Sequence, residues 1–422
     1  MGKMTKEEIY NQVIKTDDSE IYERVREHHR RMEEMEENLI KEWEKEKGIK
    51  IPRDLDEKMV TSDEKTSGIN EKMKVKDGII GLVVGDALGV PVEFKRRKEL
   101  LNNPVTDMMG HGTYNMPKGT WSDDSSLAIA TMQSIVNKKA IDYEDILTEF
   151  SLFIHEGKYT QYYTFDYGNT TESAITRFDR GTEPLKCGGT SGGEITNGSL
   201  MRILPVAFIK GIDYATIENV SAITHAHEIC KIACVLYIEI AKSMMANDLE
   251  IHEHIKRSCD KIKEHYRESS ELNNFHKIFE NKLDDVESSF YVVGTLECAL
   301  HCLLTTSSYK EAVLKAVNFG NDTDTVAAVC GGLAGIYYGF DSIPSKWINN
   351  ISQIDNVIIL CNQFEELGLE LTVGRIRYND LNDKYSNRLD GEKHAKLKER
   401  MGYVLSDEAI EDMINNHKER YS

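Results

Sequence analysis

Apolar residues recur every three or four positions along most of the 422-residue chain, which is the spacing of one face of an α-helix. Alternation of apolar and polar residues, which would indicate β-strands, is scarce, and the chain has only seven prolines. The pattern therefore predicts an all-α protein. From about residue 77 to residue 350, the helical segments alternate with loops rich in Gly, Ser, Thr and Asn.

The most apolar helical segment is DGIIGLVVGDALG, which begins at Asp77. Its glycines and unbroken apolar character predict a buried, tightly packed helix, and Asp86 inside it is expected to make structural hydrogen bonds near a site. Further along, Ser308 and Glu311 form the pattern of a capping box, and Gly320 predicts a helix end.

Two strongly charged segments flank the apolar centre, so we predict three parts: a helical arm (1–75), a central domain (76–372) and a helical appendage (373–422). In the arm, the apolar positions from Ile21 to Trp43 follow one narrow face of a long predicted helix. This face leaves three alternatives open: packing on its own domain, a solvated arm, or docking of another protein. In the appendage, Ser406 is expected to cap a short helix.

The composition excludes several classes of protein. A net charge of −19 argues against non-specific binding of nucleic acid. No apolar run approaches the ~20 residues of a membrane span, and the start MGKMTKEEIY lacks the apolar core of a signal peptide. The eight cysteines form no C-x-x-C pair and are expected to be buried apolar residues. These features predict a cytoplasmic protein with no nucleic-acid or membrane partner.

The segment GTWSDDSSLA places two adjacent carboxylates, Asp123 and Asp124, after Ser122 and ahead of an apolar helical run. One carboxylate at a helix start is explained by capping, because it accepts backbone N–H groups and suits the helix dipole. The second adds repulsion between like charges unless a cation lies between the two.

A second acidic cluster, in FGNDTDTVAAVC, contains Asp322, Asp324 and Thr325 at another predicted helix start. Oxygen ligands without neighbouring His or Cys favour hard cations such as Mg²⁺, Mn²⁺ or Ca²⁺ over zinc. Four carboxylates exceed the needs of one Mg²⁺, which indicates two metal ions. Capping alone stays an alternative for each cluster taken separately.

Three polar, glycine-rich loops each precede a helical run: GNTTES from residue 168, GGTSGGEITNGSLMRILPVA from residue 188, and THAHE from residue 224. Backbone N–H groups in such loops can bind phosphate at helix N-termini. Loops of this composition are also common as plain connectors. Arg202 in the second loop is expected to pair with a nearby carboxylate, and contact with the substrate is the alternative.

The order of these motifs over about residues 77–350 resembles the ADP-ribosylglycohydrolase family. The resemblance implies a compact all-α, multi-helix bundle with two Mg²⁺ or Mn²⁺ ions in a central cleft. It also implies metal-dependent hydrolysis of the glycosidic bond between ADP-ribose and a protein side chain. The arginine linkage is favoured, although no motif discriminates it from serine or other linkages.

By position, the resemblance implies roles for specific residues. The implied metal ligands are Ser122, Asp123, Asp124, Asp322, Asp324 and Thr325, and most members have threonine where Ser122 stands. Glu93, in PVEF, matches the acidic residue of a mobile loop over the substrate, so the candidate bases are Glu93, Asp123 and Asp124. The implied ligand-binding residues are Gly168, Asn169, Thr170, Thr190, Ser191, Gly192, Gly193, Asn197, Gly198, Ser199 and His225, with His227 as a second candidate histidine.

Two other functions stay open. Some bacterial members of the family carry an added N-terminal segment and serve as immunity proteins, so residues 1–75 are a candidate element for docking and blocking an ADP-ribosyltransferase toxin, with or without hydrolysis. A pseudoenzyme is the other alternative, and the presence of all four aspartates of the two clusters argues against it.

Overall fold

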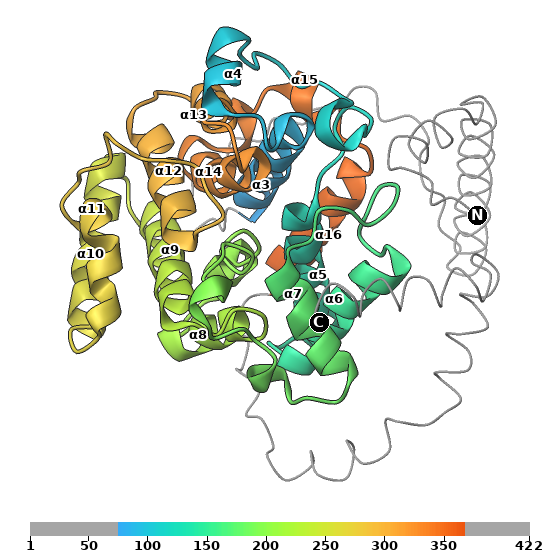
Figure 1. Cartoon of the computed structure of the whole chain (residues 1–422), viewed down its shortest axis with the longest axis vertical. Helices are drawn as coiled ribbons and strands as arrows, with labels where there is room; N and C mark the ends of the chain where they lie inside the picture. The colour runs from blue at the N-terminus through green and yellow to red at the C-terminus, as the bar shows by residue number, and fades with distance from the viewer. Residues whose placement is uncertain (1–74, 368–422) are drawn as a thin grey trace, which may run out of the picture. The chain divides into compact units, whose positions relative to one another are not determined.

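The computed structural model describes residues 75–367, which fold into helices joined by loops (Figure 1). The chain divides after Ile69 into two units, and all the described residues belong to the second. The helices predicted around 21–43 and after Ser406 lie outside the described residues. Within 75–367 there is no strand and only three isolated bridge pairs, so the prediction of an all-α fold is confirmed.

The α-helices are α3 (Val75–Gly89), α4 (Arg97–Asn102), α5 (Asp123–Lys138), α6 (Tyr143–Glu156), α7 (Asn169–Asp179), α8 (Tyr214–Ala222), α9 (Glu228–Ala246), α10 (Ile251–His265), α11 (His276–Phe279), α12 (Val292–Leu304), α13 (Tyr309–Val317), α14 (Thr323–Tyr338), α15 (Ser345–Ile348) and α16 (Ile354–Glu366). Short 3-10 helices lie between them at Val90–Val92, Gly112–Tyr114, Pro184–Lys186, Gly192–Glu194, Leu204–Phe208, Ser270–Phe275 and Phe340–Ser342. Among these helices, none has both the length and the apolar composition that crossing a lipid bilayer requires.

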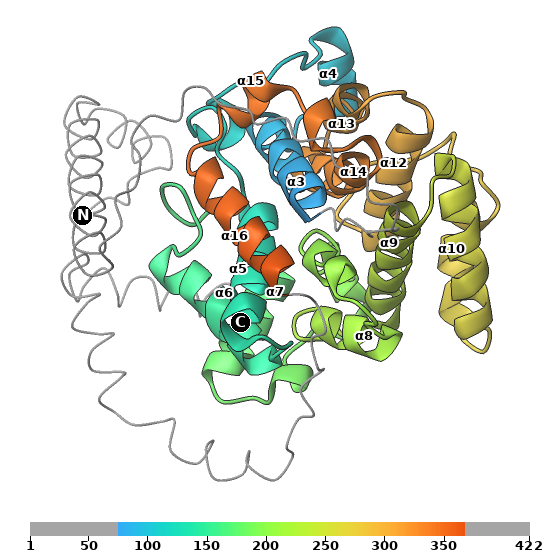
Figure 2. The ribbon, with the colours of Figure 1, turned by 180° about the vertical axis from the view of Figure 1, so that it is seen from behind.

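Helices α3 and α14 lie side by side at the centre of this unit, as the two opposite views show (Figures 1 and 2). Glycines allow their backbones to approach closely. A Cβ atom on Gly81 would lie 2.3 Å from the Gly331 carbonyl oxygen, and one on Gly85 would lie 2.1 Å from the Ala327 carbonyl oxygen. At Gly89, where α3 ends, a Cβ would meet the backbone of Asp324. The end of α3 therefore lies against the start of α14.

The remaining helices surround this pair. Helices α12 and α13 pack on α14, α16 packs on α3 and α5, and α9 packs between α8, α10 and α12. Helix α13 begins at the predicted cap, where the Ser308 hydroxyl accepts from the Glu311 N–H at 3.2 Å. The Glu311 carboxylate, however, accepts from the N–H of Ser307 and not from that of Ser308, so the predicted box closes one residue earlier.

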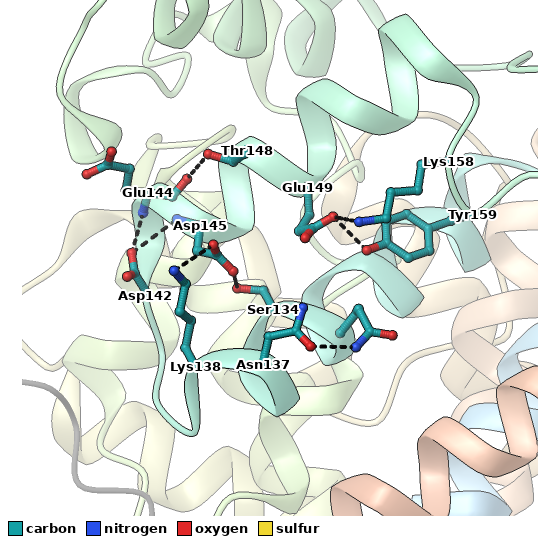
Figure 3. A network of polar contacts seen from close by, with 11 residues as sticks. Ser134, Asn137, Lys138, Asp142, Glu144, Asp145, Thr148, Glu149, Lys158 and Tyr159 are labelled. Atoms are coloured by element: carbon teal, nitrogen blue, oxygen red, sulfur yellow. Dashed lines mark hydrogen bonds and ion pairs between the residues drawn. The ribbon is translucent and has the colours of Figure 1, made fainter. Parts of the chain in front are cut away.

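A network of polar contacts joins α6 to α5 (Figure 3). Asp142 caps α6, because its carboxylate accepts from the N–H groups of Glu144 and Asp145 at 3.0 and 3.1 Å. Asp145 in turn accepts from the Ser134 hydroxyl at 2.8 Å and pairs with Lys138 at 3.1 Å, both on α5. The first turn of α6, which Asp142 caps, is therefore joined to α5 through Asp145.

The same network reaches the start of α5. The Tyr159 hydroxyl donates to Glu149 of α6 at 2.6 Å (Figure 3). The Tyr159 carbonyl oxygen accepts from the Trp121 indole N–H at 3.0 Å and from the Ser126 hydroxyl at 3.2 Å. These bonds hold the turn at Trp121, which leads directly into the first acidic cluster.

Candidate active site

Asp86, in the last turn of α3, fixes the start of α5. Its carboxylate accepts from the N–H groups of Ser122 and Ser125, each at 3.0 Å, and from the Ser125 hydroxyl at 2.5 Å. Burial raises the pKa of Asp86 to about 6, and these hydrogen bonds oppose the rise. The predicted structural role of Asp86 is therefore confirmed.

Ser122 caps α5, and the two adjacent carboxylates do not. The Ser122 hydroxyl oxygen accepts from the Asp124 N–H at 3.3 Å. Capping by Asp123 or Asp124, the simpler explanation of this pair, is therefore wrong for α5. Asp123 and Asp124 are both buried, and Asp124 Oδ1 has no hydrogen-bond partner.

Helix α14 brings the second acidic cluster to the first. Asp322 stands at its N-cap position, yet its side chain makes no capping hydrogen bond and accepts instead from the Asn197 amide at 2.6 Å. The Thr325 hydroxyl donates to Asp124 Oδ2 at 3.3 Å, which joins residues 201 positions apart. The close contact between α3 and α14 makes this meeting possible.

Three buried carboxylate oxygens of these clusters have no hydrogen-bond partner: Asp124 Oδ1, Asp322 Oδ1 and Asp324 Oδ2. One ligand oxygen each from Glu93, Asp322 and Asp324 lies within 4.8 Å of the others. Oxygen atoms in such a set are the ligands that Mg²⁺ and Mn²⁺ prefer. The residues present therefore fit a divalent cation.

The electrostatics of the clusters lead to the same interpretation. Burial, together with the charges of neighbouring carboxylates, raises the pKa values of Asp123, Asp124 and Asp324 well above their ordinary range. The helix dipoles of α5 and α14 oppose this repulsion only in part, because each supplies about half a charge. A bound cation would offset the remainder.

Glu93 is held by a residue pair that the sequence analysis missed. The Tyr114 hydroxyl lies 2.5 Å from Glu93 Oε2 and 2.5 Å from Asp166 Oδ1. Burial, and next the charge of Asp166, raise the pKa of Glu93 to about 9. The N–H of Phe94 also donates to the Asn321 carbonyl oxygen at 2.7 Å, which ties the Glu93 loop to the start of α14. Asp166 stands two residues before the GNTT motif, and this position is the feature of the sequence that could have indicated its place in the site.

A cavity of about 390 Å³ opens beside the clusters. Among the described residues that line it, none is Lys or Arg. Eleven of its lining residues belong to the predicted set: Glu93, Asp123, Gly168, Asn169, Thr170, Gly193, Asn197, Gly198, His225, Asp322 and Thr325. The other seven lining residues are Phe94, Asp166, Tyr167, Thr171, Thr196, Met201 and Phe290.

The structure does not bring every predicted ligand-binding residue to this cavity. Thr190, Ser191, Gly192 and Ser199 are absent from its lining. The N–H groups of Thr190 and Ser191 donate to Glu194 Oε2 at 3.0 and 2.9 Å, so they already have an anionic partner. The Ser199 hydroxyl is buried and accepts from the Ser221 hydroxyl at 2.9 Å.

His225 is buried at the cavity wall. Its Nδ1 lies 2.9 Å from the Thr224 hydroxyl oxygen and its Nε2 lies 2.8 Å from the Thr196 hydroxyl oxygen. Burial, assisted by the charge of Arg202, lowers the pKa of His225 to about 3. A Cβ atom on Gly198 would lie 2.8 Å from the His225 ring, so the glycine makes room for it.

Two neighbouring expectations turn out differently. His227 caps α9 by accepting from the Ile229 N–H at 3.2 Å, and it does not line the cavity. Arg202 has no carboxylate partner in the described part of the chain, so the expected ion pair is wrong. It is fully buried and donates to a carbonyl and a hydroxyl oxygen.

Comparisons with known proteins cover the part of the chain that contains this site. A family model described as ADP-ribosylglycohydrolase matches residues 68–376. The ADP-ribosylarginine hydrolase Tri1 of Serratia proteamaculans is 27% identical over 305 residues, which cover 69% of this chain and 78% of the relative. The ADP-ribosyl-[dinitrogen reductase] glycohydrolase of Rhodospirillum rubrum is 30% identical over 278 residues, which cover 64% of this chain and 88% of the relative. A solved structure titled ADP-ribosylglycohydrolase-related protein complex superposes with a TM-score of 0.61 at 25% identity, covering 71% of this chain and 99% of that one.

Proposed function

Because the chain belongs to the ADP-ribosylglycohydrolase family, we propose that it hydrolyses the bond between ADP-ribose and an arginine side chain of a modified protein. One observation carries the proposal: two acidic clusters far apart in the sequence meet beside a cavity and leave three buried carboxylate oxygens without a partner. The arginine linkage rests on the relatives named ADP-ribosylarginine hydrolase.

The acidic clusters would hold two Mg²⁺ or Mn²⁺ ions. The residues that fit this role are the predicted ones: Ser122, Asp123, Asp124, Asp322, Asp324 and Thr325. When bound, such ions supply Lewis-acid chemistry and offset negative charge around the reacting sugar.

Cleavage of the bond at the anomeric carbon passes through an oxocarbenium-like state, and a base must take a proton from the attacking water. Of the three candidate bases, Glu93 and Asp123 line the cavity, whereas Asp124 does not. Glu93 is favoured, because Asp123 is assigned to the metal ions in this proposal. The Tyr114 hydroxyl lies between the carboxylates of Glu93 and Asp166 and holds the Glu93 carboxylate in place.

The diphosphate of the substrate needs hydrogen-bond donors. Among the described residues that line the cavity, neither Lys nor Arg supplies them. Helix α7 begins at Asn169, after Gly168, and both residues line the cavity. The first N–H groups of a helix have no partner within it, and the helix dipole attracts an anion. We assign the diphosphate to this helix start.

The test uses two proteins that carry ADP-ribose on arginine or on serine, and measures free ADP-ribose released. We expect release from the arginine adduct, loss of release in EDTA, and recovery with Mg²⁺ or Mn²⁺. Asp324→Asn should abolish release, whereas Asp260→Asn, at an exposed site on α10, should leave it unchanged. Release that is unaffected by EDTA and by Asp324→Asn would refute the proposal.

Docking of a toxin by residues 1–75 and the cytoplasmic location stay predictions of the sequence. Deletion of residues 1–70 is expected to leave hydrolysis intact and to abolish binding of a cognate transferase. Full-strength binding by the truncated protein would contradict the docking role.

A further inference from the structure

The buried guanidinium of Arg202 has no place in the function described so far. Its Nη2 donates to the Val220 carbonyl oxygen at 3.0 Å and to the Thr224 hydroxyl oxygen at 2.7 Å. Its remaining nitrogens, Nε and Nη1, have no hydrogen-bond partner, and its carbon Cζ lies 4.7 Å from the centroid of the Phe150 ring. A charge buried in this way, without a carboxylate, needs an explanation.

Arg202 begins a chain of hydrogen bonds that ends at the cavity. The Thr224 hydroxyl oxygen lies 2.7 Å from Arg202 Nη2 and 2.9 Å from His225 Nδ1. On the other side of the ring, His225 Nε2 lies 2.8 Å from the Thr196 hydroxyl oxygen. Thr224 is fully buried, whereas His225 and Thr196 line the cavity.

The chemistry of arginine decides the direction of this chain. A guanidinium can only donate, so the Thr224 oxygen accepts from Arg202. The single hydroxyl proton of Thr224 then has His225 Nδ1 as its remaining acceptor, because the structure shows no other within the described residues. A neutral imidazole that accepts at Nδ1 carries its proton on Nε2, and the low pKa of His225, about 3, keeps the ring neutral.

The opposite tautomer would leave a buried group unsatisfied. With the proton on Nδ1, the Thr224 oxygen would accept two hydrogen bonds, and its own proton would have no acceptor. Buried polar groups without a partner are rare in native proteins. The proton therefore lies on Nε2 of His225, which donates to the Thr196 oxygen.

We propose that Arg202 sets this direction and leaves the Thr196 hydroxyl proton free to donate to an acceptor oxygen of the ADP-ribosyl group in the cavity. The inference rests on the proposed function for the identity of the ligand. Thr196 is a contact residue for the substrate, and Arg202, Thr224 and His225 are positioning residues. The backbone around Thr196 is fixed by its bridge to Tyr291 and by the bond from the next N–H to the Phe290 carbonyl oxygen at 3.0 Å, so the hydroxyl has a defined place.

The tautomer is tested by ¹⁵N NMR of histidine-labelled, full-length protein, with His225→Gln to assign the signal. We expect the parent protein to show the proton on Nε2 and an accepting Nδ1, and Thr224→Val to lose the signature of that accepted bond. A proton on Nδ1 in the parent protein would overturn the inference whatever the enzyme does.

The donor is tested by calorimetry with ADP-ribose. Thr196→Val should weaken binding about tenfold, the value of one lost hydrogen bond, and Thr196→Ser should restore it. Thr224→Val should also weaken the binding of ADP-ribose, although Thr224 does not line the cavity. Thr224→Ser should restore the binding. Thr148→Val, which removes an exposed hydroxyl bonded to its own helix, is the matched control.

The outcomes separate the two proposals. If the parent protein releases and binds ADP-ribose while Thr196→Val binds it as tightly, the inference fails and the proposed function stands. If the parent protein neither releases nor binds ADP-ribose, both fail. Unchanged melting temperatures of the valine variants would show that weaker binding is not caused by unfolding.

Discussion

The close packing of α3 on α14 predicts that Gly85→Ala is strongly destabilising, although alanine is the better helix former. Gly85 faces Ala327 in the middle of the contact, one turn before the end of α3 that meets Asp324. A Cβ atom at position 85 would lie 2.1 Å from the Ala327 carbonyl oxygen and 2.7 Å from its carbonyl carbon. Neither atom can rotate away, because both belong to the backbone of a buried helix.

The magnitude follows from these distances. Ordinary contact begins at 3.4 Å, so the helices must separate by about 1.3 Å, the difference between that distance and 2.1 Å. Overpacking of a core costs about 1–3 kcal/mol, and a clash with backbone belongs at the upper end. The helix propensity of alanine returns about 1 kcal/mol. We expect a net loss of about 2 kcal/mol, which corresponds to a fall of about 3 °C in the melting temperature of a unit of this size.

Thermal unfolding and urea titration of the full-length variant measure this loss. The matched control is Gly294→Ala in α12, where the added Cβ would meet the hydroxyl oxygen of Ser289 at 2.9 Å, a side-chain end that can rotate. We expect the control to be neutral or slightly stabilising, because of helix propensity. If Gly85→Ala melted at the same temperature as the control, α3 and α14 would not be in close contact, and the alignment of the two acidic clusters would lose its basis.

Three further predictions concern the site. In EDTA, Asp124→Asn should melt several degrees above the parent protein, because it removes a buried charge from a carboxylate cluster. Mg²⁺ should no longer stabilise this variant. A melting temperature below that of the parent protein would contradict the prediction. Tyr114→Phe should reduce kcat about 10–100-fold by freeing Glu93, and unchanged kcat would exclude a positioning role. Burial and the charge of Arg202 lower the pKa of His225 from 6.5 to about 3 in the folded protein. Between these two pH values the imidazole is therefore protonated in the unfolded chain and neutral in the folded one. The stability that His225 contributes is therefore complete above pH 6.5 and decreases as the pH falls towards 3, and urea titrations of His225→Gln should show a shallower decrease than those of the parent protein.

Local patterns in the sequence were sufficient for the helices and for the kind of chemistry. The 3–4 spacing predicted the helical fold, the apolar segment after Asp77 predicted the buried helix α3, and the two acidic motifs predicted oxygen ligands at helix starts. These features depend on residues within one or two helical turns, because helix periodicity and ligand type are properties of neighbouring residues.

Only the tertiary structure decided which polar groups are free and which already have partners. The Ser122 hydroxyl caps α5, so Asp123 and Asp124 do not. The Glu194 carboxylate accepts hydrogen bonds from the N–H groups of Thr190 and Ser191. The contacts of Tyr114 with Glu93 and Asp166, and of Arg202 with Thr224, join segments that no spacing rule connects. The physical reason is that a hydrogen bond depends on distances of about 3 Å, and the approach of distant segments to such distances is set by the packing of whole helices, here by the glycine contact of α3 with α14.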